Sequence, residues 1–489
     1  SSISSNYGVV KETAYSIAKA ALVQLTRSVA VEMRPFNINV NCIAPGATLT
    51  GRFKSTLNNR SKEDIEKLLD YYDYDFISID GQHSPTNEDY LLKICEASHE
   101  LDKPVHYRLD HRRHAYLIGN FLDHGPTIIE VPQSEELDLV IEATGNPEAG
   151  VDHCLAAFEA KTHVVLVTVE ADALCGAALV KRANHAGVVC SMAYGDQPAL
   201  ICELIERVKT SGFEVICAGK GTQYLPIYHK STPDTVWNYY GLSSQEAQAG
   251  GMNSKMFNSF LDGTKSAIEM ASLANATGLA VPENGLLFPP VGTSNLAQVL
   301  KPKEFGGVLT ESGMVEVVSS LNRDGSKIND DLRFGVYVVF KANSKYVSRC
   351  FSEYGVPVDN SGEYAALWRP VHLIGLELGY SVVKALLDNQ ATGATKIFKG
   401  DAVSVAKKNL TKGDILDGEG GTQVWGKLIP SRRSLSINAL PIGLANKVKL
   451  SRNINEGEII TQADVTNIRN SNAYILRKEM ENDFKEMEK

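Results

Sequence analysis

The chain has 489 residues, of which 43% are hydrophobic and 22% are charged, so it is long enough to form about three or four globular domains. Its net charge of −9 and its lack of a basic run argue against nucleic acid or an anionic membrane as a partner. Every apolar run is too short to span a bilayer and the first residues do not resemble a signal peptide, so we expect a cytoplasmic protein.

The cysteines are scattered along the chain and never occur as Cys-x-x-Cys. Most of them fall in apolar strand or helix patterns. We therefore expect buried, reduced thiols, and neither disulfides nor zinc ligands.

Residues 1–60 carry a tyrosine and a lysine one helical turn apart. Tyr15 and Lys19 lie in a segment with helical apolar spacing, and the strand-like run INVNCIAPG follows. The segment resembles the C-terminal half of a short-chain dehydrogenase/reductase, in which Ser2, Tyr15 and Lys19 match the catalytic residues. The resemblance implies that the tyrosine transfers a proton while the lysine lowers its pKa and holds the ribose. Because the family's glycine-rich loop and first strands are missing, we expect a fragment without activity of its own.

Residues 61–133 alternate between strands and helices. The strands are expected in FISIDGQHSP, PVHYRL and TIIEVPQ. The pattern resembles part of the HpcH/HpaI aldolase family, whose full fold is a TIM-type barrel. His83 matches the catalytic-site histidine of that family, and Arg108 matches the arginine that holds the keto acid. The family's metal-binding Glu and Asp have no counterparts here, so we expect a scaffold without aldolase chemistry.

Residues 134–230 contain three apolar runs, at 137–143, 163–169 and 187–191, separated by helix-length segments. This is typical of parallel strands buried on both faces in a doubly wound sheet. Ligands bind beyond the carboxyl ends of such strands. We therefore expect Thr144, Gly145 and Asn146, which follow the first run, and Glu170, which follows the second, to contact a cofactor. The Gly-x-Gly-x-x-Gly turn that binds the pyrophosphate of a dinucleotide is missing. Two glycine-rich stretches, at 219–221 and 418–421, do not have its spacing.

Long motifs over residues 137–467 are more specific than any single glycine pattern. They include EATGNPEAGVDH, MAYGDQPALICELI, KMFNSFLDGTKSAIEMASLANATGL and LDGEGG. They resemble the homoserine-dehydrogenase-like oxidoreductases with a C-terminal SAF domain, and most closely the deoxyxylulose-phosphate reductoisomerase-like proteins. The resemblance implies a partial Rossmann-like dinucleotide-binding domain at 134–230, an α+β substrate and dimerisation domain at 231–399, and a small β-rich SAF domain at 400–467. It also implies NADPH or NADH as cofactor, with Mg or Mn as an additional candidate, and a homodimer or higher homo-oligomer.

The catalytic candidates lie in and near a helix expected over residues 256–274. Asn258, Asp262, Lys265 and Glu269 share one face of that helix. A solvated polar face explains this spacing equally well. Homoserine dehydrogenases use an Asp and a Lys near the reacting carbonyl, and the resemblance makes Asp262 and Lys265 the candidates by role, joined by Glu170. Lys220, at the end of an expected strand, could bind a phosphate or protonate a carbonyl, or could be a surface lysine.

Towards the C-terminus we expect a strand at 334–340 and a helix at 372–387. AKKNLTKGDIL and LSRNINEGEII form an internal repeat with Gly413 and Gly457 in matching places. Residues 468–489 are predicted to be a charged tail, helical or frayed.

Together these features predict an NAD(P)H-dependent oxidoreductase that acts on a small phosphorylated sugar or hydroxy acid. Reduction and isomerisation of deoxyxylulose 5-phosphate, in the isoprenoid precursor route, is the leading reaction. A sugar-acid or homoserine-type dehydrogenase is one alternative. A non-catalytic mosaic or binding protein that has lost its cofactor loop is another, and an aldolase is a third.

Overall fold

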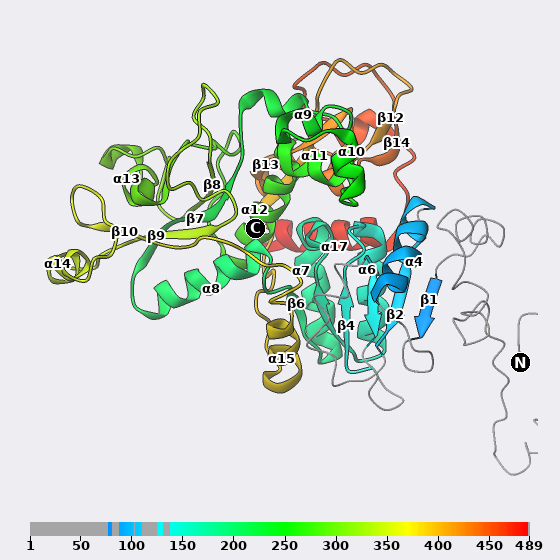
Figure 1. Ribbon diagram of the computed structural model, residues 1–489, viewed down its shortest axis with the longest axis horizontal. Helices are drawn as coiled ribbons and strands as arrows, with labels where there is room; N and C mark the ends of the chain where they lie inside the picture. The colour runs from blue at the N-terminus through cyan, green and yellow to red at the C-terminus, as the bar shows by residue number, and fades with distance from the viewer. Residues whose placement is uncertain (1–76, 81–87, 102, 110–124, 131–136, 488–489) are drawn as a thin grey trace, which may run out of the picture. The chain divides into compact units, whose positions relative to one another are not determined.

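The computed structural model describes residues 77–80, 88–101, 103–109, 125–130 and 137–487, and the chain divides into two compact units (Figure 1). The first unit comprises Ser1–His114, His124–Pro126 and Glu130–Pro132, and the second comprises the rest of the chain. Ser2, Tyr15, Lys19 and His83 lie outside the described residues, so the roles expected for them stay predictions.

In the first unit, two parallel strands are joined through a helix. β1 (Ile77–Asp80) pairs with β2 (Val105–Arg108) from Ile77 opposite Val105 to Asp80 opposite Arg108, and α4 (Glu88–Glu100) lies between them in sequence. Ile79, Leu91 and Tyr107 are buried. The strand and helix alternation predicted for this segment is confirmed in its described part, and Arg108 ends its strand as expected.

The second unit begins with the predicted parallel sheet. β4 (Leu139–Glu142), β5 (His163–Leu166) and β6 (Cys190–Met192) pair in parallel, and Ile128 and Ile129 of β3 (Ile128–Glu130) run antiparallel to β4. Successive residues Val164 and Val165 are both fully buried, so both faces of β5 are covered. The strands are followed by α6 (Pro147–Glu159), α7 (Val169–Ala186) and α8 (Gln197–Thr210). The expected α/β, Rossmann-like architecture is confirmed.

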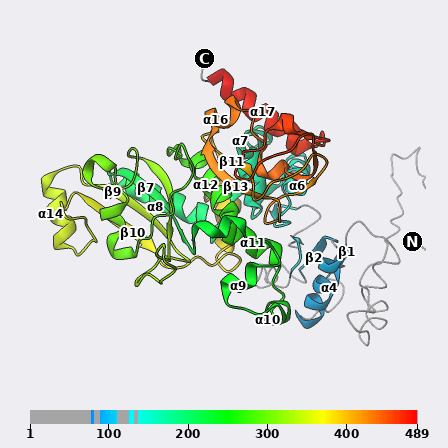
Figure 2. The ribbon, with the colours of Figure 1, turned by 90° about the horizontal axis from the view of Figure 1, so that it is seen from above.

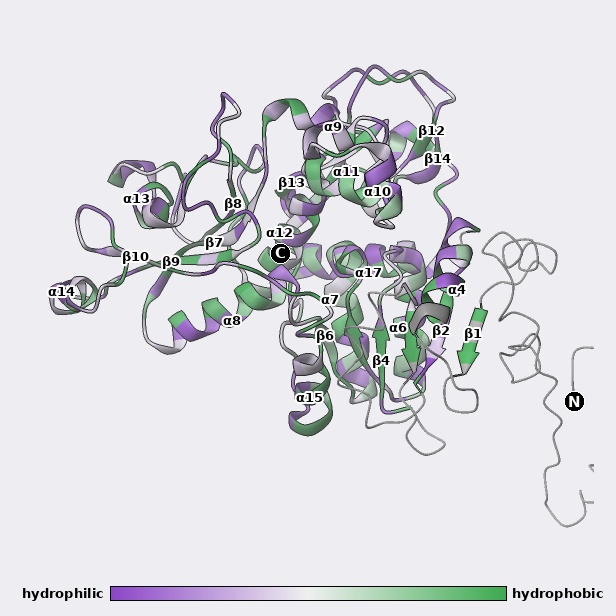
Figure 3. Cartoon of the chain, in the orientation of Figure 1, coloured by the Kyte–Doolittle hydropathy of each residue, from purple (hydrophilic) through white to green (hydrophobic). Residues whose placement is uncertain are grey.

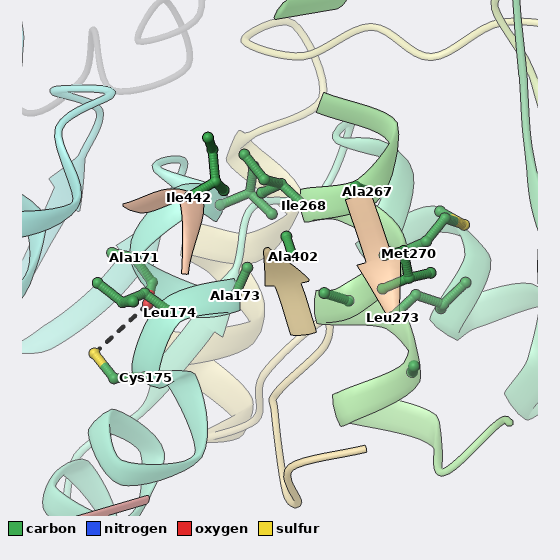
Figure 4. Packing of buried hydrophobic residues seen from close by; sticks show 14 of the residues in the cluster. Ala171, Ala173, Leu174, Cys175, Ala267, Ile268, Met270, Leu273, Ala402 and Ile442 are labelled. Atoms are coloured by element: carbon green, nitrogen blue, oxygen red, sulfur yellow. Dashed lines mark hydrogen bonds between the residues drawn. The ribbon is translucent and has the colours of Figure 1, made fainter. Parts of the chain in front are cut away.

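One buried helix connects most parts of the second unit. α12 (Thr264–Thr277) packs against α7, α8, β11 (Gly400–Ala406) and β13 (Val424–Pro430), and residues 266–275 are all buried. Figure 4 shows its apolar side chains in the shared core near Ala402 of β11. The single helix expected over 256–274 is wrong. Gly263, with φ of 92°, ends α11 (Ser254–Asp262) in the left-handed conformation that favours glycine at a helix end.

A second, mixed sheet has the strand order β10-β9-β7-β8. Its strands are β7 (Glu214–Thr222), β8 (Met314–Ser319), β9 (Val336–Lys341) and β10 (Tyr364–Arg369), and α8 packs against β7 and β9. The helix expected to begin at 372 begins at Gly379. α13 (Leu296–Val299) packs against β9 and β10, α9 (Val236–Tyr240) packs against α11, and α15 (Gly379–Asp388) packs against β5 and β6 of the parallel sheet. α10 (Ser244–Ala249) follows α9 in sequence, and α14 (Lys345–Glu353) follows β9.

The β-rich segment, residues 400–467, contains the internal repeat. Leu410 and Ile454, at matching repeat positions, exchange backbone hydrogen bonds of 2.9 and 3.0 Å. The Asn453 side chain accepts from the Lys412 amide, and Asn409 accepts in the same way from Glu456, each at 2.8 Å. The repeat therefore folds as two mutually capping copies. Besides β11 and β13, the segment holds β12 (Ile415–Asp417), α16 (Ser431–Ser436), β14 (Asn446–Leu450) and β15 (Val465–Thr466).

The C-terminal segment, predicted to be helical or frayed, forms the helix α17 (Asn472–Met487), which packs on α7 and α6 (Figure 2). Ala473, Leu476 and Met480 are buried at helical spacing among the charges, which Figure 3 shows as alternating green and purple. The guanidinium of Arg477, 1% exposed, binds Asp401 and Glu481. The cysteines within the described residues are free thiols, as expected.

Candidate functional site

The turn after β4 lies at the carboxyl edge of the parallel strands. Gly145 adopts φ of 66°, and its amide donates to the hydroxyl of Thr168 at 3.0 Å. The Thr144 amide donates to the carboxylate of Glu142 at 3.2 Å. Since Thr168 immediately precedes α7, this turn is tied to the start of that helix, where Glu170 lies.

The same turn bears on how a dinucleotide could bind. Gly145 and Asn146 are exposed, and a Cβ placed on Gly145 would meet nothing within 4 Å, so a flat ring or a ribose can approach the backbone. The Asn146 side chain accepts from the amides of Glu148 and Ala149 at 3.0 and 3.2 Å. Because Asn146 already caps α6, the first turn of this helix does not fit a pyrophosphate.

Lys265, near the start of α12, forms an ion pair with Glu170 in the first turn of α7. The Lys265 side chain is 17% exposed and that of Glu170 is 7% exposed. Burial alone would lower the pKa of Lys265, but the carboxylates of Glu170 and Glu419, with others nearby, raise it well above its ordinary value. Lys265 is therefore an ammonium at neutral pH, and part of its side chain reaches the surface.

A buried lysine pairs with Glu269, which lies one helical turn after Lys265 on α12. The ammonium of Lys220, in β7, pairs with Glu269 and donates to the Gln197 side chain at 2.7 Å. The surface-lysine alternative for Lys220 is wrong, because this residue is only 6% exposed. Asp196 caps the start of α8 beside Gln197, and burial, followed by the charge of Glu269, raises the pKa of Asp196 to about 6.

We call these groups the lysine–carboxylate cluster. It combines residues from α7, α12, β7, the cap of α8 and the β-rich segment, namely Glu170, Asp196, Lys220, Lys265, Glu269 and Glu419. The structure thus brings three of the four predicted catalytic residues, Glu170, Lys220 and Lys265, into one group.

Asp262 has a different cationic partner from the one expected. It is fully buried at the end of α11, accepts from the Thr264 amide at 2.8 Å, and lies 2.7 Å from the ammonium of Lys407. Gly263 separates Asp262 from Lys265 by ending one helix before the next begins, so Glu170 holds the Lys265 ammonium instead. The solvated-face alternative is also wrong, since Asn258, Asp262 and Glu269 are buried.

Sequence analysis predicted no role for Lys407 or Glu419. Lys407 lies in the first copy of the internal repeat, and Glu419 stands among glycines, a pattern that signals a tight loop but not the position of its side chain. Both come close to α11 and α12 only in the folded chain, so pairing by sequence spacing could not find them.

Among the residues that the structure describes, no group of three or more His, Cys, Asp or Glu side chains is arranged to hold a metal ion. Glu170 and Glu269 are both paired with lysines. No helix in the described part of the chain is long and apolar enough to cross a membrane.

Comparison with known proteins finds similarity to solved structures at low identity. The 1-deoxy-D-xylulose 5-phosphate reductoisomerase of Zymomonas mobilis, in complex with NADPH, has a TM-score of 0.20 and 12% identity, covering 44% of this chain and 55% of that one. A DOX-P reductoisomerase in complex with magnesium has a TM-score of 0.18 and 13% identity, covering 50% and 53%.

Curated relatives match over short stretches. An NAD-dependent glycerol dehydrogenase of Listeria innocua is 42% identical over 59 residues, which is 12% of this chain and 23% of the relative. Oxidoreductase UcpA of Escherichia coli is 45% identical over 58 residues, or 12% and 22%. Dehydrogenase/reductase SDR family member 4 of Mus musculus is 46% identical over 54 residues, or 11% and 19%. The chain spans less than a quarter of the length of these relatives.

Two family models match separate segments. Residues 195–378, which include Lys220, Asp262, Lys265 and Glu269, match the catalytic domain of oxidoreductase DRL. Residues 1–69 match the enoyl-(acyl carrier protein) reductase model. Both families are oxidoreductases, as the sequence predicted, and the chain is related to oxidoreductases over these two segments.

Proposed function

We propose that this chain reduces a carbonyl group of a small phosphorylated ketose or hydroxy-acid precursor, with NADPH or NADH as the hydride donor. Deoxyxylulose 5-phosphate is the leading substrate, which the chain would isomerise as well as reduce. The observation that carries the proposal is the Lys265–Glu170 ion pair, because Glu170, which holds the Lys265 ammonium, lies two residues after Thr168, whose hydroxyl accepts a hydrogen bond from the amide of the exposed Gly145. Lys265 also lies in the segment that matches an oxidoreductase catalytic domain.

The chemistry follows from the charges around Lys265. A reduced nicotinamide, when bound, supplies a hydride to the carbonyl carbon. As the electron pair of the C=O π bond moves to oxygen, the Lys265 ammonium donates a proton to that oxygen, and a hydroxyl results. Glu170 orients the ammonium. The exposed part of Lys265 then recovers a proton from solvent.

The other predicted residues have supporting roles in this proposal. Lys220 is enclosed by Glu269 and Gln197, so it positions these side chains and does not itself reach the substrate. Asp262 holds Lys407 at the base of α11. Thr144, Gly145 and Asn146 would hold the nicotinamide-ribose end of the cofactor, while the pyrophosphate lies elsewhere. We further propose that the β-rich segment corresponds to a SAF module and that the chain forms a homo-oligomer.

The test is turnover of reduced nicotinamide with deoxyxylulose 5-phosphate, a homoserine-type semialdehyde and keto forms of sugar acids. Lys265→Met should lower kcat by about 10²- to 10⁴-fold, the usual contribution of a positioned proton donor. Lys230→Met, which removes a lysine of the exposed pair with Glu456, is the matched control and should turn over normally. Full turnover by a folded Lys265→Met variant would refute the assignment. The substrate that is consumed separates the reductoisomerase from the dehydrogenase alternatives.

One observation favours the non-catalytic alternative, namely the Asn146 side chain that occupies the first turn of α6. If that cap excludes the cofactor, the chain will neither bind nor oxidise NADPH under any substrate condition. Asn146→Ala would then free the two amides of α6, and a gain of NADPH binding in that variant alone would support a protein that has lost its cofactor site.

A further inference from the structure

The glycine-rich loop at residues 417–422 of the β-rich segment touches α11 through its backbone. Gly418 and Gly420 have φ of 70° and 64°. A Cβ on Gly420 would lie 2.0 Å from the carbonyl oxygen of Lys255, in the first turn of α11, so only glycine fits. The glycines of this loop, whose spacing does not match a phosphate-binding turn, therefore allow the loop backbone to contact the helix closely.

Side chains on both partners fix this contact. The Asn258 amide donates to the carbonyl oxygens of Gly420 and Gly421 at 2.9 and 3.3 Å, and the Lys407 ammonium donates to Gly421 at 2.8 Å. The Lys255 ammonium donates to the Asp417 carbonyl at 2.7 Å. The loop is thus held against α11 from several directions, and Glu419 at its centre has a defined position.

Glu419 interacts electrostatically with Glu170 and Lys265 of the lysine–carboxylate cluster. The Ser259 hydroxyl donates to its carboxyl group at 2.5 Å. The charged groups that act on it come from each neighbouring helix: Glu170 on α7, Lys265 on α12 and Asp262 on α11. Lys265 is therefore influenced by four carboxyl groups: Glu170, its ion-pair partner, then Glu419, and with smaller effects Glu269 and Asp196.

We propose that Glu419 is a positioning residue of the reaction, which controls proton donation by Lys265 through the gain and loss of its own proton. The inference rests on the proposed function and makes the β-rich segment part of the active site. Burial, followed by the charge of Glu170, raises the pKa of Glu419 to about 8. Below that pH Glu419 is neutral and Lys265 gives up its proton more readily. Above it, a second negative charge stabilises the ammonium and weakens it as an acid.

The test measures the reactivity of the Lys265 amine by competitive acetylation with acetic anhydride and mass spectrometry, on the full chain without cofactor. Glu419→Gln is permanently neutral and similar in shape. It should raise acetylation of Lys265 about tenfold at about pH 9, because losing a nearby opposite charge lowers an amine pKa by about one unit or more, and should change it little at about pH 7. Lys230 in the same sample is the internal reference, and Glu419→Asp should restore the wild-type pH dependence.

Equal acetylation of Lys265 in wild type and Glu419→Gln at both pH values would overturn the inference. An equal increase in Lys265 acetylation at both pH values would also overturn it, because that result would indicate a structural disturbance. Turnover provides the second readout: the wild-type kcat should show a step near pH 8 that Glu419→Gln lacks. If acetylation behaves as predicted but wild-type chain oxidises no NADPH, the charge coupling holds and the proposed function fails instead.

Discussion

Replacement of Arg477 by methionine should destabilise the second unit strongly. The arginine side chain is 1% exposed, and those of its partners Asp401 and Glu481 are 2% and 5% exposed. The guanidinium donates to both oxygens of Asp401, at 2.9 and 2.6 Å, and to Glu481 at 2.8 Å. Methionine fills a similar volume but leaves the buried Asp401 carboxylate without a cation, whereas Glu481 keeps its ion pair with Lys478. Removing one partner of a buried pair costs about 3–5 kcal/mol, a large part of the roughly 5–15 kcal/mol that stabilises a typical domain.

Urea unfolding, followed by circular dichroism, measures this loss directly. Lys181→Met is the matched control, since Lys181 of α7 forms an ion pair with Asp483 of α17 in which both side chains are well exposed. That control should lose little stability, because exposed ion pairs contribute little. Adding Asp401→Asn to Arg477→Met should recover part of the stability, because it removes an uncompensated charge. A loss below about 1 kcal/mol for Arg477→Met, or no recovery in the double variant, would refute the reasoning.

Three further predictions concern the contacts around α11. Gly420→Ala forces a Cβ against the Lys255 carbonyl at a positive φ and should lower the free energy of unfolding in urea by about 2–4 kcal/mol. Gly457→Ala, whose Cβ would meet open space, should cost only the backbone strain of about 1–2 kcal/mol. Equal losses in the two variants would argue against the close approach of Gly420 to α11. Lys407→Met removes the cation beside the fully buried Asp262 and should lower the free energy of unfolding by about 3–5 kcal/mol. Adding Asp262→Asn to that variant should partly reverse the loss. Additive losses from the two substitutions would count against the ion pair. Burial lowers the pKa of His229 from 6.5 to about 4, so the stability that this neutral ring provides is complete above about pH 6.5 and is lost as the pH falls through about 4. His229→Gln should therefore reduce the loss of stability with falling pH in this window, as measured by unfolding at a series of pH values. An unchanged pH dependence would contradict the assignment.

Local sequence patterns were sufficient to predict the strands of the parallel sheet that carries the site. The apolar runs at 137–143, 163–169 and 187–191 became β4, β5 and β6 with small shifts at their ends, because buried parallel strands need continuous apolar residues. The repeat around Gly413 and Gly457 was also visible in the sequence, and both glycines adopt the positive φ that such turns require. Both features depend on a few neighbouring residues.

The contacts inside the site could not be predicted from local patterns, because they join residues that are far apart in sequence. The Asp-Gly-Thr run at 262–264 was a turn signal that helical periodicity on either side concealed, and it separates Asp262 from Lys265. Glu170 reaches Lys265 from 95 positions away. The position of Lys220 could not be predicted either, because a lysine at a strand end is normally solvated, and only its pairing with Glu269 compensates for its burial.

The central claim is that this chain binds a reduced nicotinamide dinucleotide beside Lys265. Titration of the purified chain with NADPH and with NADH, followed by nicotinamide fluorescence and thermal unfolding, tests it most directly. The account predicts saturable binding by at least one of them, with about 2.7 kcal/mol of added stability at about a hundred times Kd. Titration with ATP, which lacks the nicotinamide, controls for adenine and phosphate binding. Absence of saturable binding by both dinucleotides would contradict the claim.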